Sequence, residues 1–132
     1  MLIDIDVHGG VPIYRQVIDQ VRRLIMTGQM AEGEQLESVS NLSSRLKVNP
    51  MTISKAYSLL EMEGLLKRKR GLGLFVAGIR KEQQEKTKIT ILQEILNKAA
   101  VTAVQMDVPE ETAQNILGKL YKEYNSKKGS GK

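Results

Sequence analysis

The sequence predicts a mainly α-helical fold that contains one small β-hairpin, an α+β wing. Apolar residues recur at helical spacing in three stretches before residue 65 and in two longer stretches after residue 80. Between these groups, two short β-prone runs flank a Gly-x-Gly turn at residues 71–73. We therefore expect a first domain of three helices and a hairpin, residues 1–78, and a tail of two helices, residues 79–132.

The first helix is expected to begin at Pro12 and to end near Gly28. Proline is favoured at the start of a helix, and glycine is favoured just after its end. The apolar residues between them repeat every three or four positions and predict a buried face: Ile13, Val17, Val21, Leu24 and Ile25.

Two further helices are expected over residues 38–46 and 49–64, separated only by a short turn. Ser38 and Asn49 have side chains that accept hydrogen bonds at a helix start, and Pro50 suits the first helical position. The residues expected to face inward are Leu42 and Leu46 on the second helix and Ile53, Ala56, Leu59 and Leu60 on the third. This arrangement is a helix-turn-helix.

The third helix has Met51, Thr52, Ser54 and Lys55 on or near the exposed side of its first turns. Short polar groups and a cation at this end of a helix suit the major groove of DNA. An ordinary surface helix with a good cap would show the same local pattern. For Met51, contact with a thymine methyl and packing against the base of the hairpin are both open.

The hairpin follows the third helix directly and has four consecutive cations, residues 67–70, on its first strand. Such cations can neutralise phosphates, and a glycine turn can approach a narrow groove closely. A run of cations is also typical of a solvated surface, but its position after a helix-turn-helix favours a wing. The first domain is therefore predicted to be a winged helix-turn-helix.

Residues 11–78 resemble the N-terminal DNA-binding domain of the GntR family of bacterial transcription regulators. The matching segments are Pro12-Ile13-Tyr14-Arg15-Gln16-Val17, Leu36-Glu37-Ser38-Val39, Leu46-Lys47-Val48-Asn49-Pro50, Leu59-Leu60-Glu61-Met62-Glu63-Gly64-Leu65 and Gly71-Leu72-Gly73-Leu74-Phe75-Val76. Residues 49–57 and the short tail are similar to the YtrA subfamily. The resemblance implies a homodimeric, sequence-specific DNA-binding protein, usually a repressor. It further implies an inverted-repeat operator, commonly in the protein's own operon and in a neighbouring transporter operon.

Four positions depart from the pattern of this family. Glu37 stands where the family usually has Pro, and Ser40 stands where it has an Arg that commonly contacts DNA. At the wing, Leu72 replaces a polar or basic residue and Leu74 replaces Thr. Each change removes a polar contact or adds a carboxylate near the phosphates. We therefore expect an altered operator sequence or affinity.

In this interpretation the third helix enters the major groove and the wing tip approaches the minor groove. Ser38 would offer its hydroxyl and the N–H groups of its helix to a phosphate. The residues expected at the DNA are Ser38, Asn49, Pro50, Met51, Thr52, Ser54, Lys55, Lys67, Lys69, Arg70, Leu72 and Gly73.

The tail has two apolar stripes at helical spacing, which predict a dimerisation surface. The stripes are Leu92, Ile95, Leu96 and Ala99, followed by Ile116, Leu117, Leu120 and Tyr124. Asp107 and Glu110 have the spacing of a capping box and predict the start of the second tail helix. Two helices alone have a poor core, whereas a second copy of the chain would cover both stripes. The alternative is that the pair folds back on its own DNA-binding domain.

The composition favours a polyanionic partner and argues against an enzyme. The formal net charge is +5 and the pI is about 9.5. The chain has no cysteine and a single histidine, His8, so neither a transition-metal site nor a nucleophile–base pair is expected, and no cofactor is predicted. No apolar run is long enough to span a membrane and no signal-peptide pattern is present, so we expect a cytoplasmic protein.

Two other functional classes remain open at this point. A small-molecule effector could bind between the tails of a dimer, which would make the protein a ligand-responsive regulator. Alternatively, a winged helix could serve as a protein-binding adaptor, although exposed aromatic or apolar residues would then be expected on the third helix. The operator sequence, the regulated genes, the sign of regulation and any effector are not determined by the sequence.

Overall fold

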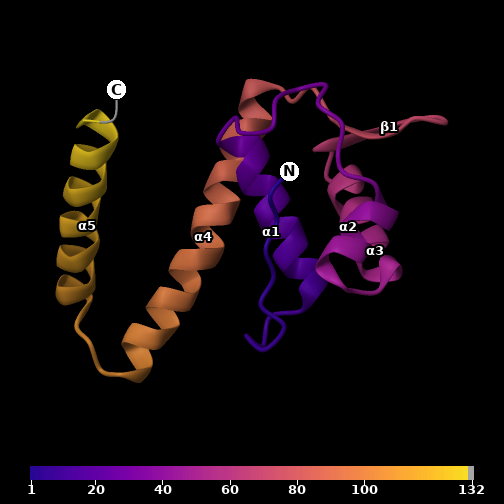
Figure 1. The fold of residues 1–132 in the computed structure, drawn as a ribbon. Helices are drawn as coiled ribbons and strands as arrows, with labels where there is room; N and C mark the ends of the chain where they lie inside the picture. The colour runs from indigo at the N-terminus through magenta and orange to yellow at the C-terminus, as the bar shows by residue number, and fades with distance from the viewer. Residues whose placement is uncertain (131–132) are drawn as a thin grey trace. The chain divides into compact units, whose positions relative to one another are not determined.

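The computed structural model describes residues 1–130, which form five helices and one two-stranded antiparallel sheet (Figure 1). In chain order the elements are α1 (Ile13–Met26), α2 (Val39–Leu46), α3 (Pro50–Met62), β1 (Leu66–Lys69), β2 (Gly73–Val76), α4 (Lys81–Gln105) and α5 (Glu110–Ser130). The predicted fold class is confirmed. The chain divides into two compact units, Met1–Ile89 and Thr90–Lys132, with the boundary inside α4.

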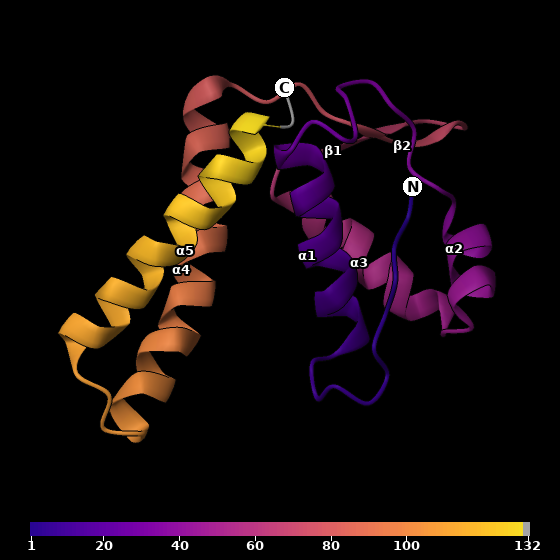
Figure 2. The ribbon, with the colours of Figure 1, turned by 60° about the vertical axis from the view of Figure 1, so that its left-hand side comes forward.

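The core of the first unit surrounds α3, which packs against α1, α2 and β1. Figure 2 shows α3 between α1 and α2. The buried apolar residues are Ile3, Val17, Ile18, Val21, Met30, Leu36, Leu42, Ile53, Ala56, Tyr57, Leu60, Leu65, Leu66, Leu74 and Val76. Most residues of the expected inward faces are among them. Leu59 is an exception, since it is 38% exposed, and Tyr57 is buried instead.

Residues 1–6 run in an extended conformation against α1 and are held by two glutamine side chains. The Gln20 amide accepts a hydrogen bond from the Asp4 N–H over 2.9 Å and donates one to the Asp4 carbonyl. The Gln16 amide makes the same pair of bonds with Asp6, at 2.7 and 2.8 Å. These amides form the hydrogen bonds that a neighbouring strand would form in a sheet, so the backbone of this segment is satisfied. Ile3 can therefore be buried.

The hairpin pairs Leu66 with Val76 and Lys69 with Gly73. Leu66, Leu74 and Val76 are buried, so one face of the hairpin closes the core of the first unit. Since successive side chains of a strand point to opposite faces, Lys67 and Lys69 lie on the face away from the core.

The tail helices bury none of their described side chains after Thr90. Only four of those residues are half-buried: Ile91, Ala103, Val108 and Ala113. The second tail helix begins at Glu110, two residues later than the predicted capping box implies, so that capping box is wrong. Asp107 has φ 57° and ends α4, because the Val108 N–H donates to the Ala103 carbonyl over 2.9 Å. Residues 131–132 of the predicted tail lie outside the described residues.

Within residues 1–130, no helix combines the length and apolar character that a membrane span requires.

A truncation at the centre of α3 tests this description of the core. The Leu60 side chain is fully buried, whereas that of Met62 is 82% exposed. Leu60→Ala is expected to lower the free energy of unfolding by about 2–5 kcal/mol, because it leaves a cavity. Met62→Ala, in the same helical turn, should change it by no more than about 0.5 kcal/mol. Urea titrations followed by circular dichroism give both values, and equal losses would contradict the described packing.

Candidate nucleic-acid interface

The start of α3 is capped as the sequence predicts. The Asn49 side chain accepts a hydrogen bond from the Met51 N–H over 2.8 Å, and Pro50 is the first helical residue. The turn before it is tight, because Lys47 adopts a left-handed conformation with φ 57° and the Val48 N–H donates to the Ser43 carbonyl. These contacts fix the angle at which α3 leaves α2.

The first turns of α3 present an exposed surface opposite their buried face. Met51 is 74% exposed, so it does not pack against the base of the hairpin. Thr52 and Ser54 are half-buried, and Lys55 is exposed. The arrangement offers an apolar group, two hydroxyls and a cation at the end of a helix that is anchored on its other side. Such a surface can enter a groove without disturbing the core.

Lys55 also contacts α1. Its Nζ atom lies 3.9 Å from the centroid of the Tyr14 ring. A cation over an aromatic face is stabilised by the quadrupole of the ring. The cation is therefore placed beside the start of α1 rather than free along the surface of α3.

The start of α2 is capped by Ser38, whose hydroxyl oxygen accepts the Asn41 N–H over 3.0 Å. Ser38 is exposed, and its O–H remains able to donate a hydrogen bond to a bound group. The N-terminus of a helix favours an anion, because its first N–H groups point outward and its dipole is positive there.

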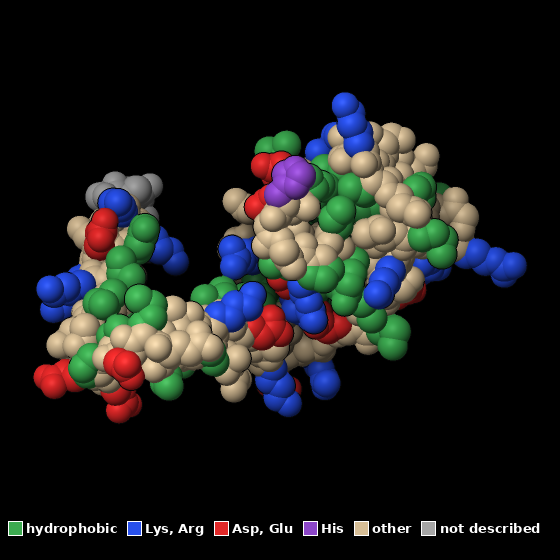
Figure 3. Space-filling model, turned by 90° about the horizontal axis from the view of Figure 1, so that it is seen from below, with side chains coloured by type: hydrophobic (Ala, Val, Ile, Leu, Met, Phe, Trp, Pro, Cys, Tyr) green, Lys and Arg blue, Asp and Glu red, His purple; other side chains and the backbone are tan. Residues whose placement is uncertain are grey.

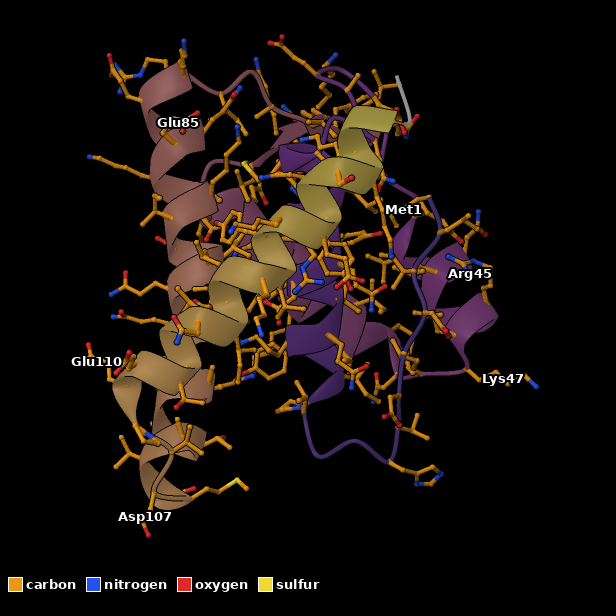
Figure 4. All side chains as sticks on the ribbon, turned by 90° about the vertical axis from the view of Figure 1, so that its left-hand side faces the viewer. Met1, Arg45, Lys47, Glu85, Asp107 and Glu110 are labelled. Atoms are coloured by element: carbon orange, nitrogen blue, oxygen red, sulfur yellow. The ribbon has the colours of Figure 1, made fainter. Side chains whose placement is uncertain are left out.

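Glu37 lies next to this cap, and its carboxylate is paired with Arg45. Arg45 donates to both carboxylate oxygens, over 2.9 and 3.2 Å, and also to the carbonyls of Met1 and Ile3 (Figure 4). The hydrogen bond to Glu37 raises the pKa of the Arg45 guanidinium. Glu37 stands where the family usually has proline, and the negative charge that it adds is therefore offset by Arg45.

The backbone of Glu37 anchors α3 as well. The Tyr57 hydroxyl donates to the Glu37 carbonyl over 2.7 Å, and burial followed by the nearby Glu37 charge raises the pKa of Tyr57. The phenol therefore stays protonated and keeps its hydrogen bond over the whole physiological pH range. This contact ties the cap of α2 to the buried side of α3.

The cations of the hairpin have different surroundings. Arg68 lies on the core side of β1 and pairs with Glu61 of α3 at 3.2 Å. Lys69 lies on the outer side, with its Nζ 4.4 Å from the centroid of the Phe75 ring. Lys67 and Arg70 are exposed. Three of the four cations thus keep their charge away from carboxylates, and these are the three that the sequence placed at the DNA.

The tip of the hairpin is held by Gln35, a residue that lies outside the hairpin. Leu72 is 65% exposed, and Gly73 has φ 116°, a conformation that favours glycine. The Gln35 amide donates to the Leu72 carbonyl over 2.6 Å, and the backbone of Gln35 bridges to Phe75. Gln35 therefore fixes the tip relative to the start of α2.

The sequence did not predict roles for Gln35 or Tyr14. Both act on residues far away in the chain, so no local spacing reveals them. The sequence contains only a weak signal for Gln35. It is a polar residue just before Leu36, in a segment that resembles a strand partner. For Tyr14, the helical spacing indicates only that it lies near the buried face of its own helix.

Among residues 1–130, no group of three or more His, Cys, Asp or Glu side chains could hold a metal ion. The sequence-predicted residues on α2, α3 and the hairpin belong to one compact unit, whereas the apolar stripes belong to α4 and α5. Figure 3 shows apolar side chains on the surface of the tail helices.

Comparison with known proteins gives a family match, a similar curated protein and similar solved structures. Residues 13–76 match the family described as bacterial regulatory proteins, gntR family. The chain is 36% identical over 102 residues to the HTH-type transcriptional repressor YtrA of Bacillus subtilis, which is 77% of this chain and 78% of that protein.

Two solved structures are also similar. A GntR family transcriptional regulator from Listeria monocytogenes has a TM-score of 0.71 and 27% identity, over 84% of this chain and 96% of the other. The AraR DNA-binding domain in complex with its operator ORX1 has a TM-score of 0.53 and 27% identity, over 58% and 99% of the two chains. The chain therefore belongs to the gntR family of bacterial regulatory proteins and is a DNA-binding transcriptional regulator with a winged helix.

Proposed function

We propose that this regulator is a homodimeric repressor that binds an inverted-repeat operator. The start of α3 is the observation that carries the proposal: it presents Met51, Lys55 and two half-buried hydroxyls on a helix anchored on its other face. Residues 1–78 would bind DNA, and residues 79–132 would hold two copies together. A protein bound to chromosomal DNA would work in the cytoplasm.

In the proposed complex, α3 lies in the major groove. The hydroxyls of Thr52 and Ser54 bond base edges or phosphates, and Met51 contacts a thymine methyl. Lys55 pairs with a phosphate. Asn49 and Pro50 set the entry of the helix, because the Asn49 side-chain oxygen caps its first turn.

The DNA backbone is held on both sides of that groove. The Ser38 hydroxyl and the first N–H groups of α2 take one phosphate. Lys67, Lys69 and Arg70 follow the backbone along the outer face of the hairpin. Leu72 and Gly73, at the tip, approach the minor groove, where the missing side chain of glycine permits a close approach.

The dimer is proposed from the exposed stripes of the tail. Leu92, Ile95, Leu96, Ile116, Leu117, Leu120 and Tyr124 are all more than a third exposed, and Ala99 is exposed too. Such contiguous apolar surface is typical of an interface. Two copies would bury it, and a two-fold dimer presents its two winged helices to two half-sites.

The negative sign of regulation is proposed from the similarity to the Bacillus subtilis repressor. A repressor bound at an inverted repeat near a promoter blocks transcription by occupying the DNA. We propose the protein's own operon and a neighbouring transporter operon as targets. Reporter fusions to the region upstream of the gene, with and without the regulator, would test the sign.

Two neutralising substitutions on one strand test the proposed wing. Lys67→Gln should lower DNA affinity and reduce the slope of log K against log salt concentration by about one unit, because one phosphate contact is lost. Arg68→Gln should change the slope much less, since Glu61 already offsets that charge. Fluorescence anisotropy over a salt series, with a site selected from random-sequence DNA, measures both. Equal slopes for the wild-type protein and both variants would show that the hairpin does not contact the DNA.

Charged substitutions in the tail test the proposed dimer. Leu96→Asp and Leu117→Asp should each produce monomers, because a carboxylate in an apolar interface loses its hydration without a partner. Val101→Asp is the matched control. Val101 is an exposed apolar residue of α4 about two and a half turns after Leu92, and therefore lies on the opposite face.

Analytical ultracentrifugation gives the oligomeric state of each variant, and anisotropy gives its affinity for a full site and for an isolated half-site. The monomeric variants should lose most of their preference for the full site, since avidity requires two joined copies. Dimers that persist in both stripe variants, or a monomeric wild-type protein, would refute the proposed interface.

A further inference from the structure

The contact between Lys55 and Tyr14 joins the DNA-facing helix to the start of α1. The Nζ atom lies 3.9 Å from the ring centroid, well inside the range of a cation–π interaction. Lys55 is exposed, so the side of its ammonium group that faces away from the ring is open to solvent. Tyr14 is half-buried and is therefore held in place by its surroundings.

The frame that presents Tyr14 is a packed pair of helices. α1 and α3 pack along their length through buried residues such as Val17, Val21 and Ile53. Further along the same pair of helices, the Arg22 guanidinium donates to the Glu63 carboxylate, with Nε 3.0 Å from Oε2. Glu63, directly after α3, follows Lys55 by eight residues, just as Arg22 follows Tyr14 on α1. The packed core and the Arg22–Glu63 pair thus hold the two helices together, which keeps the Tyr14 ring beside the first turns of α3.

A ring holds a cation without cancelling its charge. Arg68 and Arg45 are held by carboxylates, Glu61 and Glu37, and each of those pairs has little net charge to offer a phosphate. The Tyr14 ring is neutral, so Lys55 keeps a full positive charge. An ammonium group has three N–H donors and needs none of them for an ordinary hydrogen bond to the ring.

We infer that Tyr14 is a positioning residue for the DNA backbone, whose ring holds the Lys55 ammonium where a phosphate will lie. The inference rests on the proposed phosphate contact of Lys55. A lysine side chain is flexible, and ordering it on binding costs conformational entropy. Because the ring orders the side chain in the free protein, part of that cost does not arise when DNA binds. One ammonium group then bridges the ring and the phosphate.

The test compares Tyr14→Phe, Tyr14→Leu, Lys55→Ala and the double variant Tyr14→Leu/Lys55→Ala. A fluorescent mixed-sequence DNA duplex is a sufficient probe, because phosphate contacts do not depend on sequence. Tyr14→Leu should weaken binding about two- to fivefold, because the Lys55 side chain must then be ordered when DNA binds. Tyr14→Phe should stay close to wild type, because its ring still attracts the cation. The salt slope should persist in Tyr14→Leu and fall by about one unit in Lys55→Ala. In the Lys55→Ala background, Tyr14→Leu should have no further effect.

Each contrary outcome has a distinct meaning. Tighter binding by Tyr14→Leu would overturn the inference, because the ring would then compete with the phosphate for Lys55. The same loss with and without Lys55 would also overturn it, because Tyr14 would then act through something else. An unchanged salt slope in Lys55→Ala would instead refute the proposed phosphate contact itself, and the inference with it.

A measurement on the unmodified protein avoids any loss of folding in the Tyr14 variants. The ring current should shift the ε-methylene protons of Lys55 upfield in the NMR spectrum of the free full-length chain. That shift should persist when the mixed-sequence duplex is added, because the ring and the phosphate share the ammonium group. Disappearance of the shift on binding would overturn the inference.

Discussion

The burial of one face of α3 is the interaction on which the rest of the first unit depends. Ile53, Ala56 and Leu60 are fully buried against α1, α2 and β1, and Tyr57 adds a hydrogen bond to the backbone beside the cap of α2. Burial of apolar surface is the dominant favourable term in folding, so this face determines how α3 is rotated about its axis. The rotation in turn leaves Met51 and Lys55 exposed at the opposite side.

Among the described residues, electrostatic pairing decides which cations of the first unit are offset by a carboxylate. Carboxylates on the same unit engage Arg22, Arg45 and Arg68, and these arginines tie elements together. Two lysines of the proposed interface are arranged differently. Lys55 and Lys69 lie over aromatic rings, which direct the ammonium group and leave its charge intact. Arginine, with its planar fork of donors, suits paired contacts, whereas lysine suits a single phosphate oxygen.

The tail obeys a different constraint. Its helices have apolar stripes, yet no described side chain after Thr90 is buried. Exposed apolar surface of this extent is costly in water. The proposed second copy of the chain removes that cost and supplies the second winged helix. In this proposal, association of the tails is coupled to operator binding, since a single winged helix makes too few phosphate contacts to bind tightly at physiological salt.

The local features of the protein could be predicted from its amino-acid sequence. The cap at Asn49 and Pro50, the cap at Ser38, the end of α1 at Gly28 and the hairpin around residues 71–73 follow from residue chemistry and short spacings, and the structure confirms each of them. Those motifs also indicated the family, and the family match over residues 13–76 confirms it.

Only the tertiary structure decided how distant residues meet. Leu59 fits the helical repeat but lies partly outside the core, because the positions of α1 and β1 determine which side of α3 is covered. Asp107 has the spacing of a capping residue but ends the preceding helix, because backbone hydrogen bonds there favour a left-handed turn. The contacts of Lys55 with Tyr14, of Glu37 with Arg45 and of Gln35 with Leu72 join elements that local periodicity treats separately. Periodicity describes one helix or strand at a time, whereas these contacts depend on how the elements pack together.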